Sequence, residues 1–139
     1  MIKIQTIDVE MPTMVLSEIR CWLEKLTASH GRSVGELYYI FCSDDYLFRM
    51  NEEKLGHHFL TDIITFPLNE CENILSSEFY ISLDRIRDNA KIFERSFDDE
   101  LHRVMAHGLL HLCGFDDLTE EESLEMRKQE DIALIMLNA

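Results

Sequence analysis

The feature that most constrains the fold of this chain is the string HGLLHLCGFDD at residues 107–117. His107 and His111 stand four residues apart, so on a helix they lie on one face, about one turn from each other. Gly114 follows where a glycine can end a helix in the left-handed conformation at low cost. The chain can then turn back and bring Asp117 to the imidazoles. The string predicts a helix over residues 98–113 that ends beside three converging side chains.

Strand and helix patterns alternate through the rest of the chain. Apolar or alternating runs predict strands at residues 2–6, 36–42, 62–66 and 79–82, and helical spacing predicts helices at 14–26, 44–55, 86–93 and 119–137. Ser43 is a predicted N-cap, Gly56 a predicted helix end, and Thr119 with Glu122 a predicted capping box. About four strands and five helices indicate an α+β fold, a small mixed sheet packed with helices that include a zincin-like histidine helix.

Length and composition indicate one domain over residues 1–139. The chain has 139 residues, is 46% hydrophobic and contains only two prolines, with no repeat or low-complexity linker. The N-terminal MIKIQTIDVE lacks the apolar run of a signal peptide, and no apolar stretch approaches the roughly 20 residues that span a bilayer. The cysteines are scattered and predict reduced thiols. We therefore expect a cytoplasmic location and no membrane association.

The formal net charge of −14 excludes one class of function. A protein that coats nucleic acid needs a broad surface of lysine and arginine to neutralise phosphates, and this chain cannot supply one. Any contact with nucleic acid must be local. Most acidic residues near the C-terminus fit a solvated helix start, where carboxylates complement the helix dipole. Asp117 is the exception.

Two histidines and a carboxylate are ligands that suit Zn²⁺. Three protein ligands leave a fourth position for water, which is the arrangement of a catalytic site rather than a structural one. A histidine pair alone is often a surface or core feature, but the added glycine and carboxylate match the His-x-x-x-His-x-x-Gly-x-x-ligand spacing of metzincin proteases. Those proteases require a glutamate after the first histidine, and this chain has Gly108 there. Peptidase chemistry therefore lacks its general base.

The other candidates are weaker. Arg85 begins a predicted helix and can hold a phosphate as a bidentate donor, although a salt bridge with Asp84 or Asp88 explains it equally well. His57 and His58 lie in a predicted loop, where we expect them to face solvent. His102 is five residues before His107 and is turned away from the ligand face; we expect a surface or packing role. Asp116 is the predicted support of a ligating imidazole.

Residues 107–117 resemble the hallmark of the YbeY family of metal-dependent endoribonucleases, His-Gly-x-Leu-His-Leu-x-Gly-Tyr-Asp-His. The segment MNEEKLGHHFLTDIITFP is similar to the family's Leu-Asn segment that leads to Thr-Asp-Val-Leu-Ser-Phe-Pro, and FYIS is similar to its next strand. The resemblance covers about residues 50–131. Three positions depart from the family pattern: Asp117 replaces the third histidine, Leu55 replaces an arginine, and Ser77-Glu78 replaces Gly-Asp.

The resemblance implies an endoribonuclease of ribosomal RNA maturation. Its implied ligands for one Zn²⁺ are His107, His111 and Asp117, and its implied partners are ribosomal RNA or a pre-ribosomal particle, with a ribosomal protein as a further partner. The expected chemistry is phosphodiester hydrolysis by a metal-activated water, with Arg85 positioning the RNA backbone. Two alternatives stay open: a ribosome-associated binding module with a structural metal, and a metalloprotease-like hydrolase.

Overall fold

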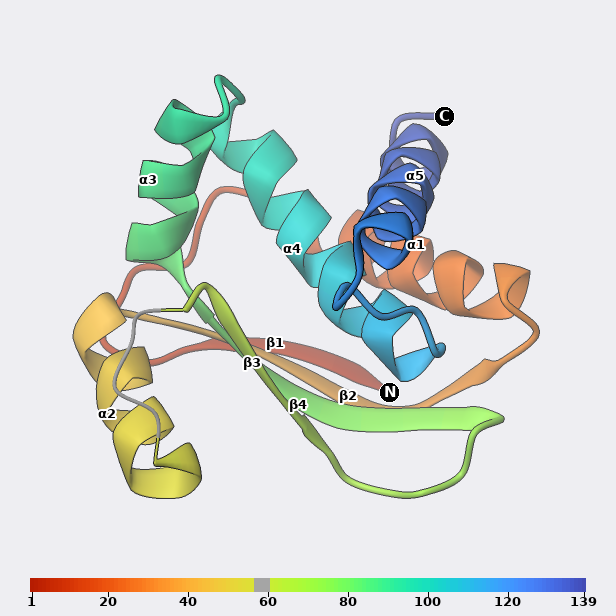
Figure 1. Cartoon of the computed structure of the whole chain (residues 1–139), viewed down its shortest axis with the longest axis horizontal. Coiled ribbons are helices and arrows are strands. Elements are labelled where there is room, and N and C mark those ends of the chain that lie inside the picture. Colours follow the sequence, from red (N-terminus) through yellow and green to blue (C-terminus); the bar gives the residue numbers. More distant parts are fainter. Residues whose placement is uncertain (57–60) are drawn as a thin grey trace.

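The computed structural model describes residues 1–56 and 61–139 of the chain. In chain order its elements are β1 (Ile2–Thr6), α1 (Leu16–Ser29), β2 (Ser33–Cys42), α2 (Asp44–Leu55), β3 (Ile63–Pro67), β4 (Ile74–Ser82), α3 (Leu83–Ile92), α4 (Phe97–Leu112) and α5 (Glu120–Leu137). The strands form one sheet in the order β1-β2-β4-β3. Strands β1, β2 and β4 are parallel, and β3 pairs antiparallel with β4. The predicted α+β fold with a small mixed sheet is confirmed (Figure 1).

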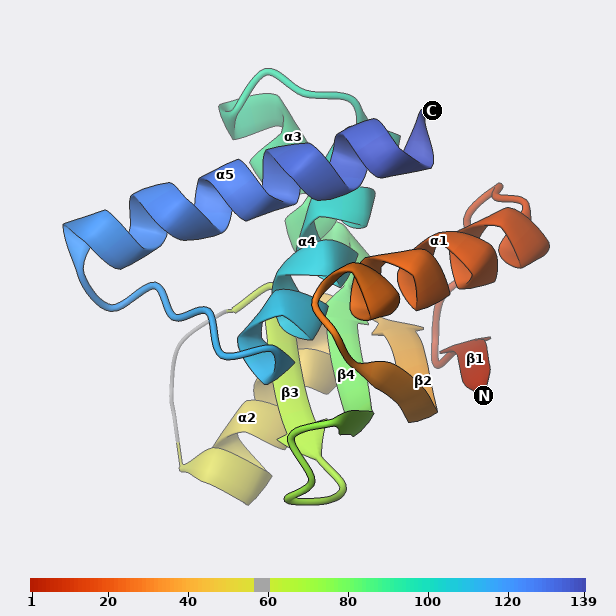
Figure 2. The same ribbon diagram turned by 90° about the vertical axis from the view of Figure 1, so that its right-hand side faces the viewer.

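The helices divide unequally between the faces of the sheet. Figure 1 shows α1, α4 and α5 on one side of it and α2 on the other, and Figure 2 shows α5 lying across α4. The main core lies on the α4 side. A smaller cluster of Cys42, Leu47 and Ile64 packs beneath α2.

Alternating residues of the two central strands build the main core. Leu37, Tyr39 and Phe41 of β2 are fully buried, as are Phe79 and Ile81 of β4. This alternation is expected because successive side chains of a strand point to opposite faces.

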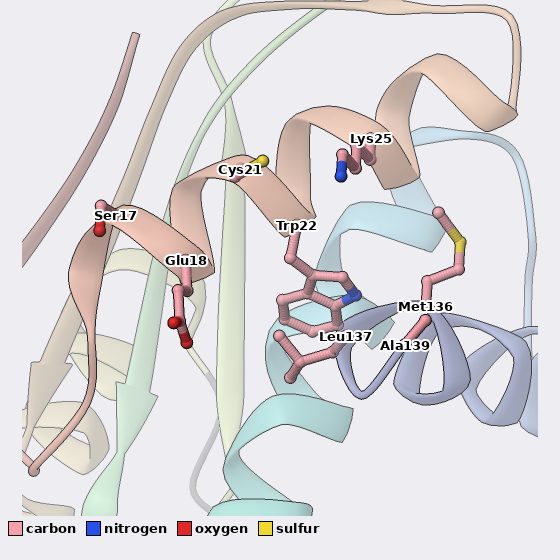
Figure 3. Close-up of a pocket in the computed structure, with 8 residues that line it drawn as sticks. All are labelled: Ser17, Glu18, Cys21, Trp22, Lys25, Met136, Leu137 and Ala139. Carbon is pink, nitrogen blue, oxygen red and sulfur yellow. The ribbon is translucent and has the colours of Figure 1, made fainter.

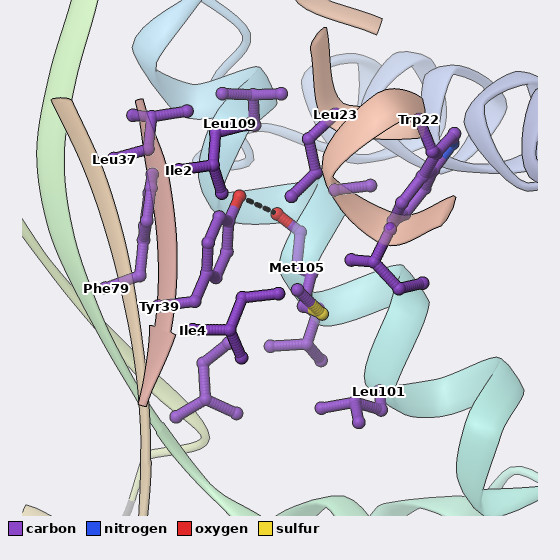
Figure 4. Packing of buried hydrophobic residues seen from close by; sticks show 14 of the residues in the cluster. Ile2, Ile4, Trp22, Leu23, Leu37, Tyr39, Phe79, Leu101, Met105 and Leu109 are labelled. Carbon is purple, nitrogen blue, oxygen red and sulfur yellow. Dashed lines mark hydrogen bonds between the residues drawn. The ribbon is translucent and has the colours of Figure 1, made fainter. Parts of the chain in front are cut away.

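Tyr39 fixes helix α4 over the centre of the sheet. Its ring stacks on Phe79 with 4.6 Å between ring centroids, and its hydroxyl donates a 2.9 Å hydrogen bond to the carbonyl of Met105 in α4 (Figure 4). The buried hydroxyl thus has a partner, as a polar group in a core requires.

Helix α4 approaches the sheet through Gly108. A Cβ atom at this position would lie 2.8 Å from Cδ1 of Ile63 and 2.8 Å from Cδ1 of Phe79. Such distances are shorter than van der Waals contact, so only glycine allows this approach. Helix α5 is tied to the fold separately, because the indole Nε1 of Trp22 in α1 donates a 2.7 Å hydrogen bond to the carbonyl of Ala133.

The predicted helix ends are confirmed. Ser43 caps α2 by accepting from the backbone N–H of Tyr46, Gly56 ends α2 with φ of 68°, and Thr119 forms a capping box with Glu122. Two predicted strands were too short, since β2 begins at Ser33 and β4 at Ile74.

The start of β4 was missed because it is rich in polar residues, although it pairs with β2 from Ile74 and with β3 from Ser77. Ser77, for example, lies between β2 and β3, is fully buried, and donates from its hydroxyl to the carbonyl of Phe66. Within the described part of the chain, no helix has the length and apolar character needed to cross a membrane.

We predict that Gly108→Ala lowers the free energy of unfolding by about 1–2 kcal/mol, because crowding costs about 1–3 kcal/mol and the helix propensity of alanine recovers up to about 1 kcal/mol. Urea unfolding of wild type and variant measures the difference. Combining Gly108→Ala with Phe79→Leu, which removes part of the opposing ring, should cost less than the sum of the single changes. A Gly108→Ala variant as stable as wild type would contradict this account.

Candidate metal centre

His107 and His111 lie on the last turns of α4, and the Nε2 edges of their imidazole rings face one another. Their Nε2 atoms are 2.9 Å apart, and their rings are nearly perpendicular, with 85° between the planes. Their side chains are 23% and 29% exposed, so each imidazole is accessible to solvent although most of its surface is buried. The predicted pairing on one helix face is confirmed.

The turn after α4 brings Asp117 to the two imidazoles. Gly114 has φ of 98°, a left-handed conformation that lets the chain reverse directly after the helix. Oδ2 of Asp117 then lies 3.4 Å from Nε2 of His107 and 3.7 Å from Nε2 of His111. The hydroxyl of Ser123 in α5 donates to the backbone carbonyl of Asp117 at 3.1 Å and holds the turn in place.

Glu130 orients His107. Its Oε2 lies 2.7 Å from Nδ1 of His107, and its side chain is only 14% exposed. If Nδ1–H donates to this carboxylate, Nε2 keeps its lone pair and points it toward Asp117, as a metal-ligating histidine must. The sequence favoured Asp116 for such support. That expectation is wrong for His107, because Asp116 is exposed and Glu130 takes the role.

The charges around His107 favour a cation. Burial lowers the pKa of His107, but the hydrogen bond to Glu130 and the charges of Glu130 and Asp117 raise it, and the net pKa lies above the ordinary value. Nearby, burial raises the pKa of Asp62, partly offset by His107. A divalent metal ion would experience the same attraction from the carboxylates.

The three donor atoms fit a tetrahedral metal ion. Zinc bonds of about 2.0–2.1 Å in tetrahedral geometry separate neighbouring ligand atoms by about 3.3 Å. The observed separations of 2.9, 3.4 and 3.7 Å lie on both sides of this value. All three side chains can therefore contribute one ligand atom each to a single ion. The two imidazoles and one carboxylate also match zinc chemically.

A cavity of about 160 Å³ opens beside His107. It lies among α4, α5, the turn after α3 and the residue before β3, and it combines acidic and basic side chains. Its lining residues are Asp62, Phe93, Arg95, Glu100, Arg103, Val104, His107, Arg127 and Glu130. Asp62 and Arg127 were not singled out by sequence reasoning.

The remaining predicted residues lie elsewhere. Arg85, at the start of α3, places Nε 3.1 Å from both carboxylate oxygens of Asp44 and also pairs with Asp88. It does not line the cavity beside His107, and its role toward phosphate stays a prediction. His102 packs edge-on against Trp22 with 5.9 Å between centroids, which confirms a packing role. His57 and His58 lie outside the described residues.

A larger cavity, about 400 Å³, lies between α1 and the end of α5 (Figure 3). Trp22 projects between the two helices there, near Leu137 and Met136. Its described lining has one carboxylate, one lysine and one thiol but no histidine. These groups do not form a ligand cluster, so the chemistry is concentrated at His107.

Gly108 argues against peptidase chemistry. It occupies the position at which metzincin proteases carry their catalytic glutamate. Because a Cβ at this position would overlap Ile63 and Phe79, a glutamate here requires those side chains or the helix to shift. The packing at Gly108 therefore disfavours that base.

The chain matches one family of known proteins over most of its length. The family profile described as Endoribonuclease YbeY matches residues 2–138. The chain is similar to the endoribonuclease YbeY of Phocaeicola vulgatus, with 45% identity over 99% of this chain and 100% of the relative. It is also similar to that of Cytophaga hutchinsonii, with 48% identity over 85% of this chain and 82% of the relative.

A solved structure has the same fold. The solution structure of TM1509 from Thermotoga maritima matches with a TM-score of 0.73 and 28% identity, covering 99% of this chain and 89% of that one. The profile match extends over nearly the whole chain, and the relatives are aligned over most of their own length. The chain belongs to the endoribonuclease YbeY family.

Proposed function

We propose that residues 1–139 form one metal-dependent hydrolase domain, a zinc-dependent endoribonuclease that acts in ribosomal RNA maturation. Family membership supports the reaction class. The metal dependence in this proposal rests on one observation, the convergence of Nε2 of His107, Nε2 of His111 and Oδ2 of Asp117. This set suits one Zn²⁺ with a fourth position left for a non-protein ligand.

Each side chain has a separable task in this proposal. His107 and His111 contribute neutral nitrogen donors from one helix face, and Asp117 contributes the anionic donor from the following turn. Glu130 holds the His107 ring in its ligating orientation. When bound, the metal supplies Lewis acidity toward a phosphate oxygen and lowers the pKa of water. Gly108 keeps α4 close enough to the sheet to hold the histidines in register.

The two alternatives have less support. A metalloprotease-like hydrolase needs a general base, but this chain has glycine at the usual glutamate position, and the packing around Gly108 disfavours a larger residue. A binding module with a structural metal would be expected to have a closed four-ligand site. The described residues contribute three ligands whose side chains are 23%, 29% and 41% exposed, which favours an accessible site.

The proposed substrate is ribosomal RNA, presented within a pre-ribosomal particle or by a ribosomal protein. The net charge of −14 supports presentation by a partner, because an acidic surface repels free polyanions. Such a substrate is consistent with the cytoplasmic location expected from the sequence, which stays a prediction.

We predict that purified wild-type protein contains one equivalent of zinc. His107→Ala and Asp117→Ala should each lower metal affinity by at least about 10-fold and abolish metal-dependent RNA cleavage, because each removes one of only three ligands. Metal content by plasma mass spectrometry and cleavage of ribosomal RNA fragments are measured on the same samples.

The matched control for the metal variants is Asp116→Ala, which removes an exposed carboxylate next to Asp117. It should retain both metal and cleavage. A folded wild type that contains no metal, and that gains no activity when zinc is added, would overturn the proposed function and leave a binding module.

Glu130→Gln is predicted to lower zinc affinity by about 10–100-fold while leaving the fold intact, because the neutral amide supports the His107 ring less well than the carboxylate. Competition with a chromophoric chelator measures the affinity. Glu125→Gln, an exposed change on the same helix, serves as the control. Equal affinities in wild type and Glu130→Gln would show that Glu130 does not tune the site.

The isolated protein should bind naked ribosomal RNA weakly at physiological salt, with a dissociation constant no tighter than the roughly 10⁻⁶–10⁻⁴ M of non-specific binding. Filter binding at 150 mM salt measures this value, and purified pre-ribosomal particles should bind more tightly. Tight binding to the naked RNA would argue against delivery by a partner.

A further inference from the structure

The cavity beside His107 contains cationic groups that the proposed metal site does not use. Three arginines line it, Arg95, Arg103 and Arg127, although the chain as a whole is strongly acidic. A cation beside a metal site can either stabilise the fold or bind substrate. The ion pairs of each arginine distinguish these roles.

Two of the arginines form ion pairs with carboxylates. Arg95 places Nη1 3.0 Å from Oε1 of the buried Glu100. Arg103 places Nη1 2.7 Å from Oδ1 of Asp131 and Nε 3.4 Å from Oδ2 of Asp99. These pairs tie the turn before α4 and helix α5 to α4. Both arginines therefore have structural partners.

Arg127 differs from both. It is exposed on α5, and among the described residues no carboxylate lies within ion-pair distance of its guanidinium. It is four residues after Ser123 and three before Glu130, so all three lie along one side of the helix. Ser123 binds the backbone of Asp117 and Glu130 binds His107. Arg127 thus lies on α5 between two contacts to predicted metal ligands.

We propose that Arg127 is a positioning residue that binds a phosphate of the RNA beside the His107, His111 and Asp117 site. This inference rests on the proposed function. An unpaired guanidinium suits a phosphodiester because its fork of N–H donors matches two phosphate oxygens. Helix α5 lies across α4 (Figure 2) and contacts His107 through Glu130, so Arg127 projects toward the cavity from a helix whose position is fixed.

The surrounding acids favour a phosphate at the mouth of the cavity rather than deeper inside. Asp62, Glu100 and Glu130 line it and repel an anion. Of the described arginines there, Arg127 is the one without an acidic partner, so a phosphate gains most attraction where it meets this residue.

The test compares Arg127→Ala with Arg127→Lys and with Lys128→Ala. Lys128→Ala is the matched control, because it removes one positive charge from the adjacent exposed residue that does not line the cavity. All variants should contain as much metal as wild type. Arg127→Ala should lower kcat/KM for RNA cleavage by about 10–100-fold, Arg127→Lys should fall between, and Lys128→Ala should stay within about 2-fold of wild type.

A second readout does not depend on cleavage. Stopped-flow anisotropy with a labelled single-stranded RNA measures binding to the metal-loaded protein before it cuts, at several salt concentrations. Loss of one phosphate contact should reduce the slope of log affinity against log salt by about 0.7 in Arg127→Ala, with no change in Lys128→Ala.

The outcomes separate the two proposals. A wild type that cleaves RNA, with Arg127→Ala and Lys128→Ala indistinguishable in both readouts, would overturn the role of Arg127 alone. Loss of metal from Arg127→Ala would also overturn it, because the residue would then support the metal site rather than the substrate. A metal-loaded wild type that fails to cleave ribosomal RNA both naked and within pre-ribosomal particles would overturn the proposed function, and the salt slope would still test Arg127.

Discussion

The contact between helix α4 and the central strands is the constraint on which the rest of the structure depends. Gly108 lets the helix backbone approach Ile63 and Phe79 to a distance that no Cβ would permit, and the hydroxyl of Tyr39 fixes the helix by donating to the carbonyl of Met105. Both contacts lie within a turn of His107. Because interiors are close-packed and stiff, the ligand-bearing face is held in one orientation relative to the sheet. The same glycine removes the general base of a protease, so the packing that builds this site also restricts its chemistry.

Helix α5 completes the site from the far end of the chain. Its Ser123 holds the turn that carries Asp117, and its Glu130 orients His107. Its position over α4 is set independently by the hydrogen bond from Trp22 in α1 to the carbonyl of Ala133. The ligand cluster therefore depends on three helices, although all three ligands fall within residues 107–117. This arrangement places supporting side chains far from the ligands in sequence and close to them in space.

That separation explains which features could be predicted from the sequence. Local signals succeeded: the spacing of His107 and His111, the turn at Gly114 and the capping box at Thr119 each depend on a few neighbouring residues. Glu130 was not identified as the partner of His107 because the contact spans 23 residues. The sequence did contain one signal for Glu130. This residue follows the buried Met126 by four positions and precedes the buried Ala133 by three, which places a carboxylate on an apolar helix face. The start of β4 was missed because its serines are satisfied by tertiary hydrogen bonds, which no local pattern records.

The electrostatics of the site follow from these same contacts and bear on substrate selection. Asp117, Glu130 and Asp62 surround His107 with negative charge, and the acidic start of α5 extends this field outward. A free polyanion is repelled by such a surface, and at physiological ionic strength that repulsion is largely screened at separations beyond about 8 Å. A phosphodiester can therefore approach only where cations, a bound metal or an unpaired arginine, offset the carboxylates. Under the proposed function, this repulsion would contribute selectivity. RNA that no partner positions would be repelled from the site, and such discrimination does not require base-specific contacts.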